Sequence, residues 1–401
     1  MASRGGRKPH RGARWALLLV AGGLLVSGCT SGGAGEPPKE VKVSTAPPPK
    51  PASLELSPAG SVDDFAPGEP VTVSVDDGEL TEVSLVGADD TVVKGAKEKD
   101  GSGWSTSEKL GYGKTYTLKA EAVGADGKPV TATSTITTAT PNRQVNVSLN
   151  VRDDQKVGVG MPLIFTFTGS VPDRAAAEDA LRVVSEPKTE GAFHWFGDQS
   201  VTWRPKEYWK PGTKVTVDAG IYGIDLGDGT FGMEDRSAKL TVGDKVVAVA
   251  DGGSHKMTVS VNDKVVKTMP LSMGKQSSPT PKGTYTVMSE HRGYTMDSST
   301  YGVPTDSAAG YRTYTEYAVR MSNSGIFYHS APWSVGQQGN SNVSHGCINL
   351  STANAAWLME TSRPGDIITV KNSGGPELEP TDGWSVWQMP WKDWKSNSQQ
   401  N

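Results

Sequence analysis

Cysteine is almost absent from this chain, whose 401 residues include only Cys29 and Cys347. A disulfide between them is one interpretation, but the two residues lie in such different sequence contexts that separate roles are favoured. Basic clusters are also lacking, and the formal net charge is −4. Because binding to nucleic acid depends on concentrated positive charge, the composition argues against nucleic acid as a partner.

Long apolar runs are missing after Thr30, and helical periodicity is scarce. No stretch in that part of the chain reaches the length that crosses a bilayer. Glycine and proline are abundant, with 47 and 26 residues, which favours turns and therefore strands over long helices. A chain of this length is expected to form more than one domain.

Residues 1–28 have the layout of a secretory signal peptide, in which a short apolar run at 15–26 follows the basic residues Arg4, Arg7, Lys8, Arg11 and Arg14. Small residues then precede Cys29, and this arrangement resembles a bacterial lipobox. The resemblance implies that Cys29 is acylated and anchors the chain on the outer face of the cytoplasmic membrane. An uncut transmembrane anchor is the alternative, but the apolar run is short for one. Residues 29–52 lack periodicity and are predicted to be a disordered tether.

Two segments of similar pattern follow the tether. In each, an alternating run (71–75 and 163–167) opens after a Gly-X-Pro sequence, and a tryptophan (Trp104 and Trp203) precedes a second alternating run. Alternation at period two predicts strands with one buried face. The pattern therefore predicts a mainly β chain.

Short strands and frequent turn signals predict two immunoglobulin-like β-sandwiches, at residues 53–142 and 145–243. A rigid spacer is favoured over a ligand-binding module as their role. One loop in the second segment carries carboxylates and a glycine carbonyl that suit a structural calcium ion, although a plain acidic turn is favoured: Asp225, Asp228 and Gly229.

A third, mainly β domain is expected at residues 245–371. Runs at 246–249 and 257–261 predict strands, and 353–360 is the best short helix candidate. The tail at 372–401 holds four tryptophans, which are expected to pack on an earlier domain rather than to bind glycan: Trp384, Trp387, Trp391 and Trp394.

Two clusters in the third domain carry chemistry. His329 lies in one and Cys347 in the other, and a lone cysteine with a histidine elsewhere in the chain is a candidate nucleophile and base. An imidazole nearby removes the thiol proton and stabilises the charge left behind. Gly346 lets the backbone approach a substrate carbonyl, so its amide and that of Cys347 are candidate oxyanion donors. Inert packing of a buried cysteine is the alternative.

The residues around this pair decide between these interpretations. His329, a spacer and the sequence Ser-His-Gly-Cys-Ile-Asn at 344–349 resemble the L,D-transpeptidase catalytic domain, also called the YkuD domain. The run at 279–285 matches that family's upstream segment. The resemblance extends from the lipobox onward, and two immunoglobulin-like domains with a Trp-rich tail are similar to the actinobacterial branch of the family.

The resemblance implies roles for individual residues. Cys347 is the expected nucleophile, His329 its general base, and Ser330 orients His329 through its backbone carbonyl, while His345 and Gly346 shape the turn before the thiol. Residues 294–302 match a lid over the thiol. The expected substrate contacts are Met296, Tyr301, Tyr311, Ser324, Gly325, Trp333 and Asn349.

The resemblance also implies a reaction. The thiol attacks the carbonyl of the third residue of a peptidoglycan tetrapeptide stem, D-Ala leaves, and the side-chain amine of a second stem takes the acyl group to form a 3-3 cross-link. Exclusion of water favours transfer over hydrolysis. No cofactor is needed, and carbapenem β-lactams are expected to acylate the same thiol.

Three other classes of function stay open at this point. A wall-binding protein with a dead site is disfavoured by the intact His329 and Cys347. A hydrolase that only trims stems, and a transferase that attaches proteins to the wall, share the same acyl-enzyme and differ in the acceptor.

Overall fold

The computed structural model describes residues 49–307 and 310–399, with the backbone alone at Tyr301. The described chain is mainly β, as the sequence predicted, and belongs to one compact unit that begins at Pro49. No helix in this part of the chain is long and apolar enough to cross a membrane. Cys29, the predicted signal peptide and most of the predicted tether lie outside the described residues.

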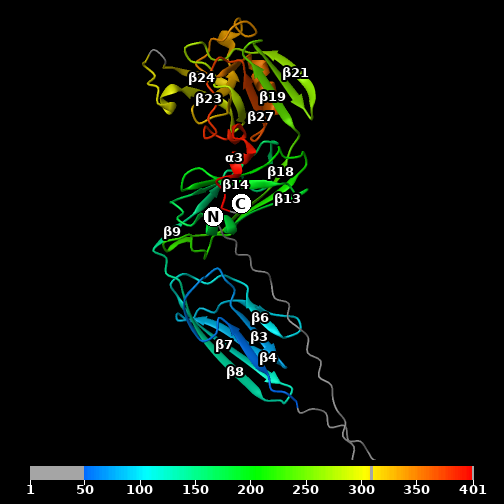
Figure 1. Ribbon diagram of the computed structural model, residues 1–401, viewed down its shortest axis with the longest axis vertical. Coiled ribbons are helices and arrows are strands. Elements are labelled where there is room, and N and C mark those ends of the chain that lie inside the picture. Colours follow the sequence, from blue (N-terminus) through cyan, green and yellow to red (C-terminus); the bar gives the residue numbers. More distant parts are fainter. Residues whose placement is uncertain (1–48, 308–309, 400–401) are drawn as a thin grey trace, which may run out of the picture. The chain divides into compact units, whose positions relative to one another are not determined.

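Two four-stranded sheets form the first sandwich (Figure 1). Alternate residues such as Val73, Val75, Leu118 and Ala120 are buried between them, which explains the alternating pattern. One sheet has the order β1 (Ser53–Ser57), β3 (Thr72–Asp76), β6 (Gly103–Thr106), β5 (Gly95–Lys97), and the other has the order β2 (Ser61–Phe65), β8 (Pro129–Thr138), β7 (Thr115–Gly124), β4 (Gly78–Gly87).

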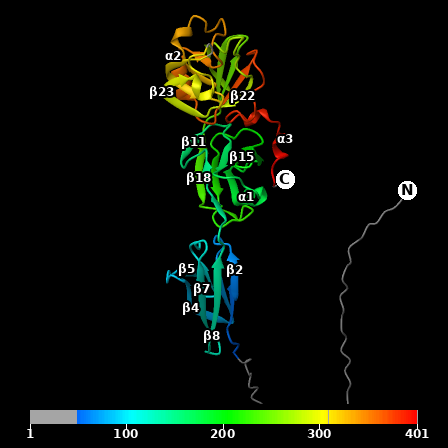
Figure 2. The ribbon, with the colours of Figure 1, turned by 90° about the vertical axis from the view of Figure 1, so that its left-hand side faces the viewer.

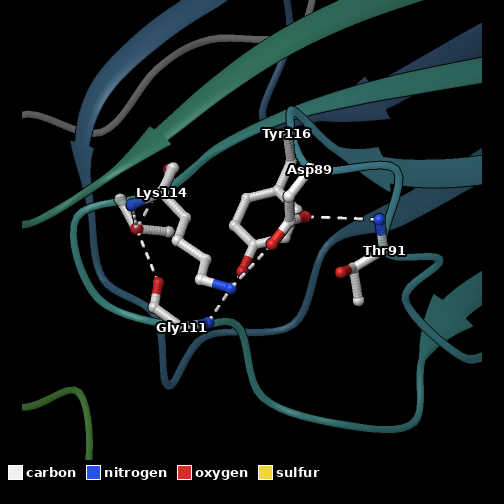
Figure 3. A network of polar contacts seen from close by, with 6 residues as sticks. Asp89, Thr91, Gly111, Lys114 and Tyr116 are labelled. Carbon is white, nitrogen blue, oxygen red and sulfur yellow. Dashed lines mark hydrogen bonds and ion pairs between the residues drawn. The ribbon is translucent and has the colours of Figure 1, made fainter.

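A polar network orders the loops at one end of this sandwich (Figure 3). Lys114 Nζ lies 3.2 Å from a carboxylate oxygen of Asp89, whose other oxygen accepts the N–H of Thr91 at 3.2 Å. The N–H of Gly111 donates to the hydroxyl of Tyr116 at 2.9 Å. Both charged side chains are about half exposed, so solvent screens the ion pair and it contributes little to stability.

The second sandwich repeats the two-sheet plan. The N-terminus of its helix α1 (Arg174–Ala180) is capped by Asp173, whose carboxylate accepts the N–H of Ala176. A small parallel pair joins β9 (Arg143–Val145) to β17 (Thr230–Gly232). The two main sheets have the orders β10 (Val147–Leu149), β12 (Leu163–Phe167), β15 (Ser200–Pro205), β14 (Gly191–Trp195) and β11 (Gln155–Val157), β18 (Arg236–Val242), β16 (Lys214–Ala219), β13 (Leu181–Glu186).

The two sandwiches share one packing detail. Trp104 on β6 lies across Gly95 of the neighbouring strand, and Trp203 on β15 lies across Gly191. A Cβ atom on either glycine would stand 2.0 Å from the indole ring, so only glycine leaves room for it. The repeated tryptophan was visible in the sequence pattern, whereas its glycine partner was not.

The acidic loop of the second sandwich is held by a hydrogen bond within the loop and by one from Asn142. Asp225 Oδ1 accepts the N–H of Gly227 at 2.9 Å, and the carbonyl of Gly229 accepts the N–H of Asn142 at 2.9 Å. Among the described residues, no group of three or more His, Cys, Asp or Glu side chains is placed to hold a metal ion. The loop, with Asp228 at φ 53°, is a hydrogen-bonded acidic turn, and the calcium interpretation stays a prediction.

The third domain contains two sheets and one longer helix. Helix α2 (Thr352–Thr361) is capped at its N-terminus by the hydroxyl of Ser351. It includes the predicted helix at 353–360 and packs on the second sheet (Figure 2). The first sheet has the order β21 (Lys264–Pro270), β20 (Lys256–Val261), β19 (Val246–Asp251), β27 (Ile367–Lys371), β22 (Gly283–Thr286). The second sheet has the order β23 (Ser289–Asp297), β24 (Arg312–Arg320), β25 (Phe327–Ser330), β26 (Ile348–Leu350).

The Trp-rich tail, with η3 (Val386–Gln388) and α3 (Trp391–Lys395), packs on the second sandwich. Trp394 has no exposed surface, and its Nε1–H donates to the carbonyl of Ala192 at 2.9 Å. The guanidinium of Arg204 lies 4.7–5.3 Å from the ring centres of Trp387, Trp391 and Trp394. Packing on an earlier domain, the role favoured from the sequence, is therefore what the structure shows.

Backbone contacts also join the second sandwich to the third domain. The N–H of Gly158 donates to the carbonyl of Pro364, and the N–H of Gly160 donates to the carbonyl of Gly365, each at 2.8 Å. A Cβ at Gly158 would lie 2.1 Å from the backbone nitrogen of Asp366. The two backbone segments approach this closely because Gly158 and Gly160 have no side chains.

Replacement of Gly158 by alanine should therefore destabilise the chain. Forcing a methyl group against backbone is expected to cost about 1–3 kcal/mol, because neither chain segment can yield without losing hydrogen bonds. The midpoint of thermal unfolding measures the loss. Gly220→Ala is the control, since its Cβ would meet only the carbonyl of Ala180 at 3.7 Å. Equal midpoints for the two variants would contradict the prediction.

Candidate active site

The second sheet of the third domain brings the histidine and the cysteine together. Strands β25 and β26 pair in parallel, so that His329 lies opposite Asn349, and Cys347 directly precedes β26. Residues two apart on a strand point to the same face, which places Cys347 on the side of Asn349. His329, Cys347 and Asn349 accordingly line one cavity.

This cavity has a volume of about 260 Å³. It gathers most of the residues predicted from the sequence, although they come from different strands and loops. The predicted residues in its wall are Met296, Tyr311, His329, Trp333, His345, Cys347 and Asn349, and the additional ones are Thr313, Ser334, Val343 and Ser344. Ser344 opens the Ser-His-Gly-Cys motif, whereas Thr313, Ser334 and Val343 carried no signal that distinguished them from ordinary loop or strand residues.

One hydrogen bond fixes the orientation and the tautomer of His329. Its Nδ1 lies 2.9 Å from the backbone carbonyl of Ser330. Because a carbonyl oxygen only accepts, Nδ1 must carry the proton, and Nε2 is left with a lone pair. The ring is buried and stacks on Trp333 with centroids 5.9 Å apart. The imidazole is thus held as a base.

The carbonyl that orients His329 is itself held by Thr315, which the sequence did not single out. Thr315 Oγ1 donates to the carbonyl of Ser330 at 2.8 Å. The hydroxyl of Ser330 accepts backbone N–H groups of Glu316 and Tyr317 at 3.1 and 3.3 Å. Strand β24 therefore fixes Ser330, and Ser330 fixes the histidine.

Cys347 is a free, buried thiol. Its Sγ donates to the backbone carbonyl of Gly325 at 3.4 Å. Burial raises the pKa of this thiol to about 12, against smaller opposing effects from the Phe327 backbone and Arg320. Burial also lowers the pKa of His329 to about 4. At neutral pH the site therefore contains a neutral thiol and a neutral imidazole rather than an ion pair.

The turn before the thiol is closed by Ser344. Its hydroxyl donates to the carbonyl of Cys347 at 2.6 Å and accepts the N–H of Gly346 at 3.1 Å. Gly346 has φ 128°, a conformation that favours glycine. The amide of Gly346 is occupied by this bond, so the expectation that it faces an oxyanion is not met in this conformation.

Thr280, inside the predicted upstream segment, fixes the next peptide. Its buried hydroxyl donates to the carbonyl of Gly346 at 2.7 Å and accepts the N–H of Gly274 at 3.0 Å. In a trans peptide the C=O and the N–H point in opposite directions, so the N–H of Cys347 points away from Thr280. Within the described residues this N–H has no hydrogen-bond acceptor.

His345 shapes the same turn from outside. Its ring stacks on Tyr311 with centroids 5.4 Å apart, and its Nε2 lies 3.2 Å from Lys275 Nζ. Because an ammonium group only donates, this Nε2 is an acceptor. Burial and the charge of Lys275 lower the pKa of His345. The hydroxyl of Ser278 donates to the backbone carbonyl of His345 at 2.8 Å.

The predicted lid lies beside the thiol. Met296, which is 2% exposed, shares an apolar cluster with Cys347 and Phe327. The short helix η1 (Ser298–Tyr301) follows, capped by the carboxylate of Asp297. The side chain of Tyr301 is outside the described residues.

Ser324 and Gly325 do not line the cavity, in contrast to the expectation from the sequence. Ser324 is exposed, and it is held by the carboxylate of Asp382. Gly325 contacts the site only through its carbonyl, which accepts a hydrogen bond from the thiol of Cys347.

Comparison with known proteins agrees with this geometry. The family described as the L,D-transpeptidase catalytic domain matches residues 245–370, and the bacterial Ig domain family matches residues 62–225. L,D-transpeptidase 2 of Mycobacterium tuberculosis (strain CDC 1551 / Oshkosh) is 42% identical over 404 residues, which covers 99% of this chain and 98% of that protein. The chain belongs to the L,D-transpeptidase family. The resemblance to the L,D-transpeptidase catalytic domain seen in the sequence is thereby confirmed, and the chain is placed among acyltransferases of peptidoglycan cross-linking.

Other L,D-transpeptidases are also similar to this chain. L,D-transpeptidase 5 of Mycobacterium tuberculosis (strain ATCC 25618 / H37Rv) is 36% identical over 395 residues, covering 96% of this chain and 85% of that protein. A solved L,D-transpeptidase in complex with imipenem is 41% identical, covering 56% of this chain and 99% of that one, with a TM-score of 0.49.

The neutral thiol and imidazole predict an unusual pH dependence for alkylation of Cys347 by iodoacetamide. With His329 as base, the rate should be flat around neutral pH and fall only as the pH approaches 4, where the imidazole of the folded enzyme becomes protonated. Mass spectrometry of the intact L,D-transpeptidase at a series of pH values gives the rates.

His329→Ala is the matched variant for this measurement. Without the base, alkylation should depend on the thiolate alone and rise about tenfold per pH unit below a thiol pKa of about 12. A wild-type rate that also rises in this way would show that His329 does not take the thiol proton.

Proposed function

We propose that this chain forms 3-3 cross-links in peptidoglycan, with Cys347 as nucleophile and His329 as general base. The observation that supports this most directly is the pair itself: a buried thiol and an imidazole with Nε2 unprotonated line one cavity. The donor is a tetrapeptide stem, and the acceptor is the side-chain amine of the third residue of a second stem. The chain would act at the outer face of the cytoplasmic membrane, anchored by lipid on Cys29.

The first half of the proposed reaction forms a thioester. Sγ of Cys347 bonds to the carbonyl carbon of the third residue as Nε2 of His329 takes the thiol proton. The tetrahedral intermediate collapses, the bond to the terminal D-Ala breaks, and the imidazolium returns its proton to the leaving amine. The neutral resting pair suits this step, because charge separates only as the new bond forms.

The second half repeats these steps in reverse. The acceptor amine attacks the thioester carbonyl and gives its proton to Nε2 of His329. The intermediate expels the thiolate of Cys347, which regains the proton from the imidazolium. The new amide joins two third residues. These steps use the thiol, the imidazole and backbone groups, and neither a metal nor a cofactor takes part in them.

The amide of Cys347 is the proposed oxyanion donor. Its N–H is free of other acceptors in the described chain, and Thr280 fixes the peptide that carries it. A preorganised donor at this point stabilises the negative charge that develops on the carbonyl oxygen, by about 3–4 kcal/mol in well-studied cases.

Asn349 is the proposed anchor for the donor stem. Its Nδ2 donates to the hydroxyl of Ser334 at 3.0 Å, while its buried Oδ1 has no partner among the described residues. Buried acceptors are normally satisfied, so an N–H of the bound stem suits this position. Met296 and Trp333, which line the same cavity, would exclude water from the thioester.

Carbapenem β-lactams are proposed as covalent inhibitors of the same thiol. A related L,D-transpeptidase has been solved in complex with imipenem, and another in complex with a faropenem-derived adduct. Here the strained lactam carbonyl would take the place of the third-residue carbonyl at Cys347.

The test uses the full chain and a disaccharide-tetrapeptide. Mass spectrometry should show loss of D-Ala and formation of a cross-linked dimer. Cys347→Ala should abolish both products, and His329→Ala should slow them by about 10²–10⁴ through loss of the base. Loss of D-Ala without a dimer would instead identify a trimming hydrolase, and no acyl-enzyme at all would contradict the proposal.

The role of Thr280 gives a second prediction. Thr280→Val removes the hydroxyl that fixes the Gly346 carbonyl, so D-Ala release should fall by about 10²-fold if the Cys347 amide is misaligned. Alkylation by iodoacetamide forms no oxyanion and should change much less. Thr280→Ser keeps the hydroxyl and serves as control. Equal losses in both assays would show that Thr280 is needed only for the integrity of the site.

A further inference from the structure

A carboxylate in the C-terminal tail holds the turn that contacts the thiol. Asp382 Oδ1 accepts the N–H of Ser324 at 2.8 Å, and its Oδ2 accepts the hydroxyl of the same residue at 2.5 Å. Asp382 lies after the last strand of the third domain and outside the cavity wall. Two charge-assisted bonds to one residue define both its position and its orientation.

Only one residue, Gly325, separates the restrained Ser324 from the contact with the thiol. Ser324 is followed by Gly325, whose carbonyl accepts the thiol of Cys347 at 3.4 Å. Gly325 has φ 93°, so its backbone has the wide freedom of glycine and does not hold itself in place. Inside the turn, the hydroxyl of Ser322 donates to that of Ser324 at 2.9 Å and accepts the N–H of Ile326 at 3.0 Å.

Ser324 would lose its order without the carboxylate. Its side chain is exposed, so water would compete for its N–H and hydroxyl groups. The inner side of the turn has its own support, since the guanidinium of Arg320 donates to the carbonyl of Ser322 at 3.1 Å. Asp382 therefore restrains the outer half of the turn, which is the half that leads into Gly325.

The position of Asp382 is fixed by the tail residues that follow it. Its carbonyl accepts the hydroxyl of Ser385 at 2.8 Å. Gly383 passes so close to the turn that a Cβ would lie 3.0 Å from Cα of Ser322. Further along, Trp387 donates to the carbonyl of Gly160, and Trp394 is buried on the second sandwich.

We propose that Asp382 is a positioning residue for the L,D-transpeptidase reaction, acting through Ser324 and the Gly325 carbonyl to hold the Cys347 thiol where His329 can take its proton. This inference rests on the proposed roles of Cys347 and His329. It adds a residue that touches neither the substrate nor the reacting atoms.

The test compares Asp382→Ala, Asp382→Asn and the control Asp393→Ala in the full chain. Asp393 is an exposed aspartate of the same tail, on α3. Asp382→Ala should slow acylation of Cys347 by imipenem about tenfold or more at saturation, as expected when a reacting group is misplaced. The half-saturating concentration should be unchanged, because Asp382 does not line the cavity. Asp382→Asn retains an acceptor and gains a donor for Ser324, so it should stay close to the wild type, as should Asp393→Ala.

A second readout separates positioning from general loosening of the fold. In Asp382→Ala, alkylation by iodoacetamide should rise with pH, as in His329→Ala, because the thiol is no longer presented to the imidazole. Ser324→Ala should weaken the same contact, and its effect should not add to that of Asp382→Ala.

Two results would overturn this inference. One is wild-type acylation and a flat pH profile in Asp382→Ala. The other is an equal loss in Asp393→Ala, which would mean that the tail matters only for stability. If the wild-type chain itself formed no acyl-enzyme, the proposed function would fail, whereas the alkylation profiles of the variants would still decide the role of Asp382.

Discussion

The hydrogen bond between His329 Nδ1 and the carbonyl of Ser330 is the constraint on which the rest of the site depends. It assigns the ring proton to Nδ1, so only Nε2 can act as base. A carbonyl cannot compensate an imidazolium as a carboxylate would, and burial disfavours that charge further. Protonation of His329 is therefore favourable only when a negative charge forms nearby at the same time. The arrangement suits a reaction in which bond formation and proton transfer occur together.

The surroundings of the thiol follow the same logic. Cys347 lies among Met296, Phe327 and Ala318, where burial disfavours a free thiolate, and its hydrogen bond to Gly325 fixes the position of the thiol. Such a thiol reacts slowly with stray oxidants unless His329 takes its proton as the new bond forms, because the thiolate is the reactive form. The reactivity of the thiol therefore depends on its position relative to His329, and hydrogen bonds to backbone groups set the positions of both side chains. Thr280, Thr315 and Asp382 hold these backbone groups through hydrogen bonds, although none of the three lines the cavity.

Sequence reasoning identified the parts of this site that are contiguous in the chain. The motif around Cys347 and the His329–Ser330 pair could be found because neighbouring residues there act together. Alternating strands, the helix at 353–360 and the packing of the tail were also predictable, since burial imposes a local period or composition. Thr315 could not be found in this way, because its role arises from the pairing of β24 with β25. The bond that occupies the Gly346 amide likewise depends on the shape of the turn.

The proposed role of Asp382 would make the tail, which has no catalytic groups of its own, matter for catalysis. Its tryptophans surround Arg204 of the second sandwich, where burial lowers the pKa of the guanidinium to about 10. This packing fixes a segment that also reaches the turn beside the thiol through Asp382. A spacer domain and a catalytic turn are thus parts of one continuous set of contacts. With the proposed role of Asp382, the second sandwich is more than a spacer, because loss of its packing against the tail would act through Asp382 and Ser324 on Gly325.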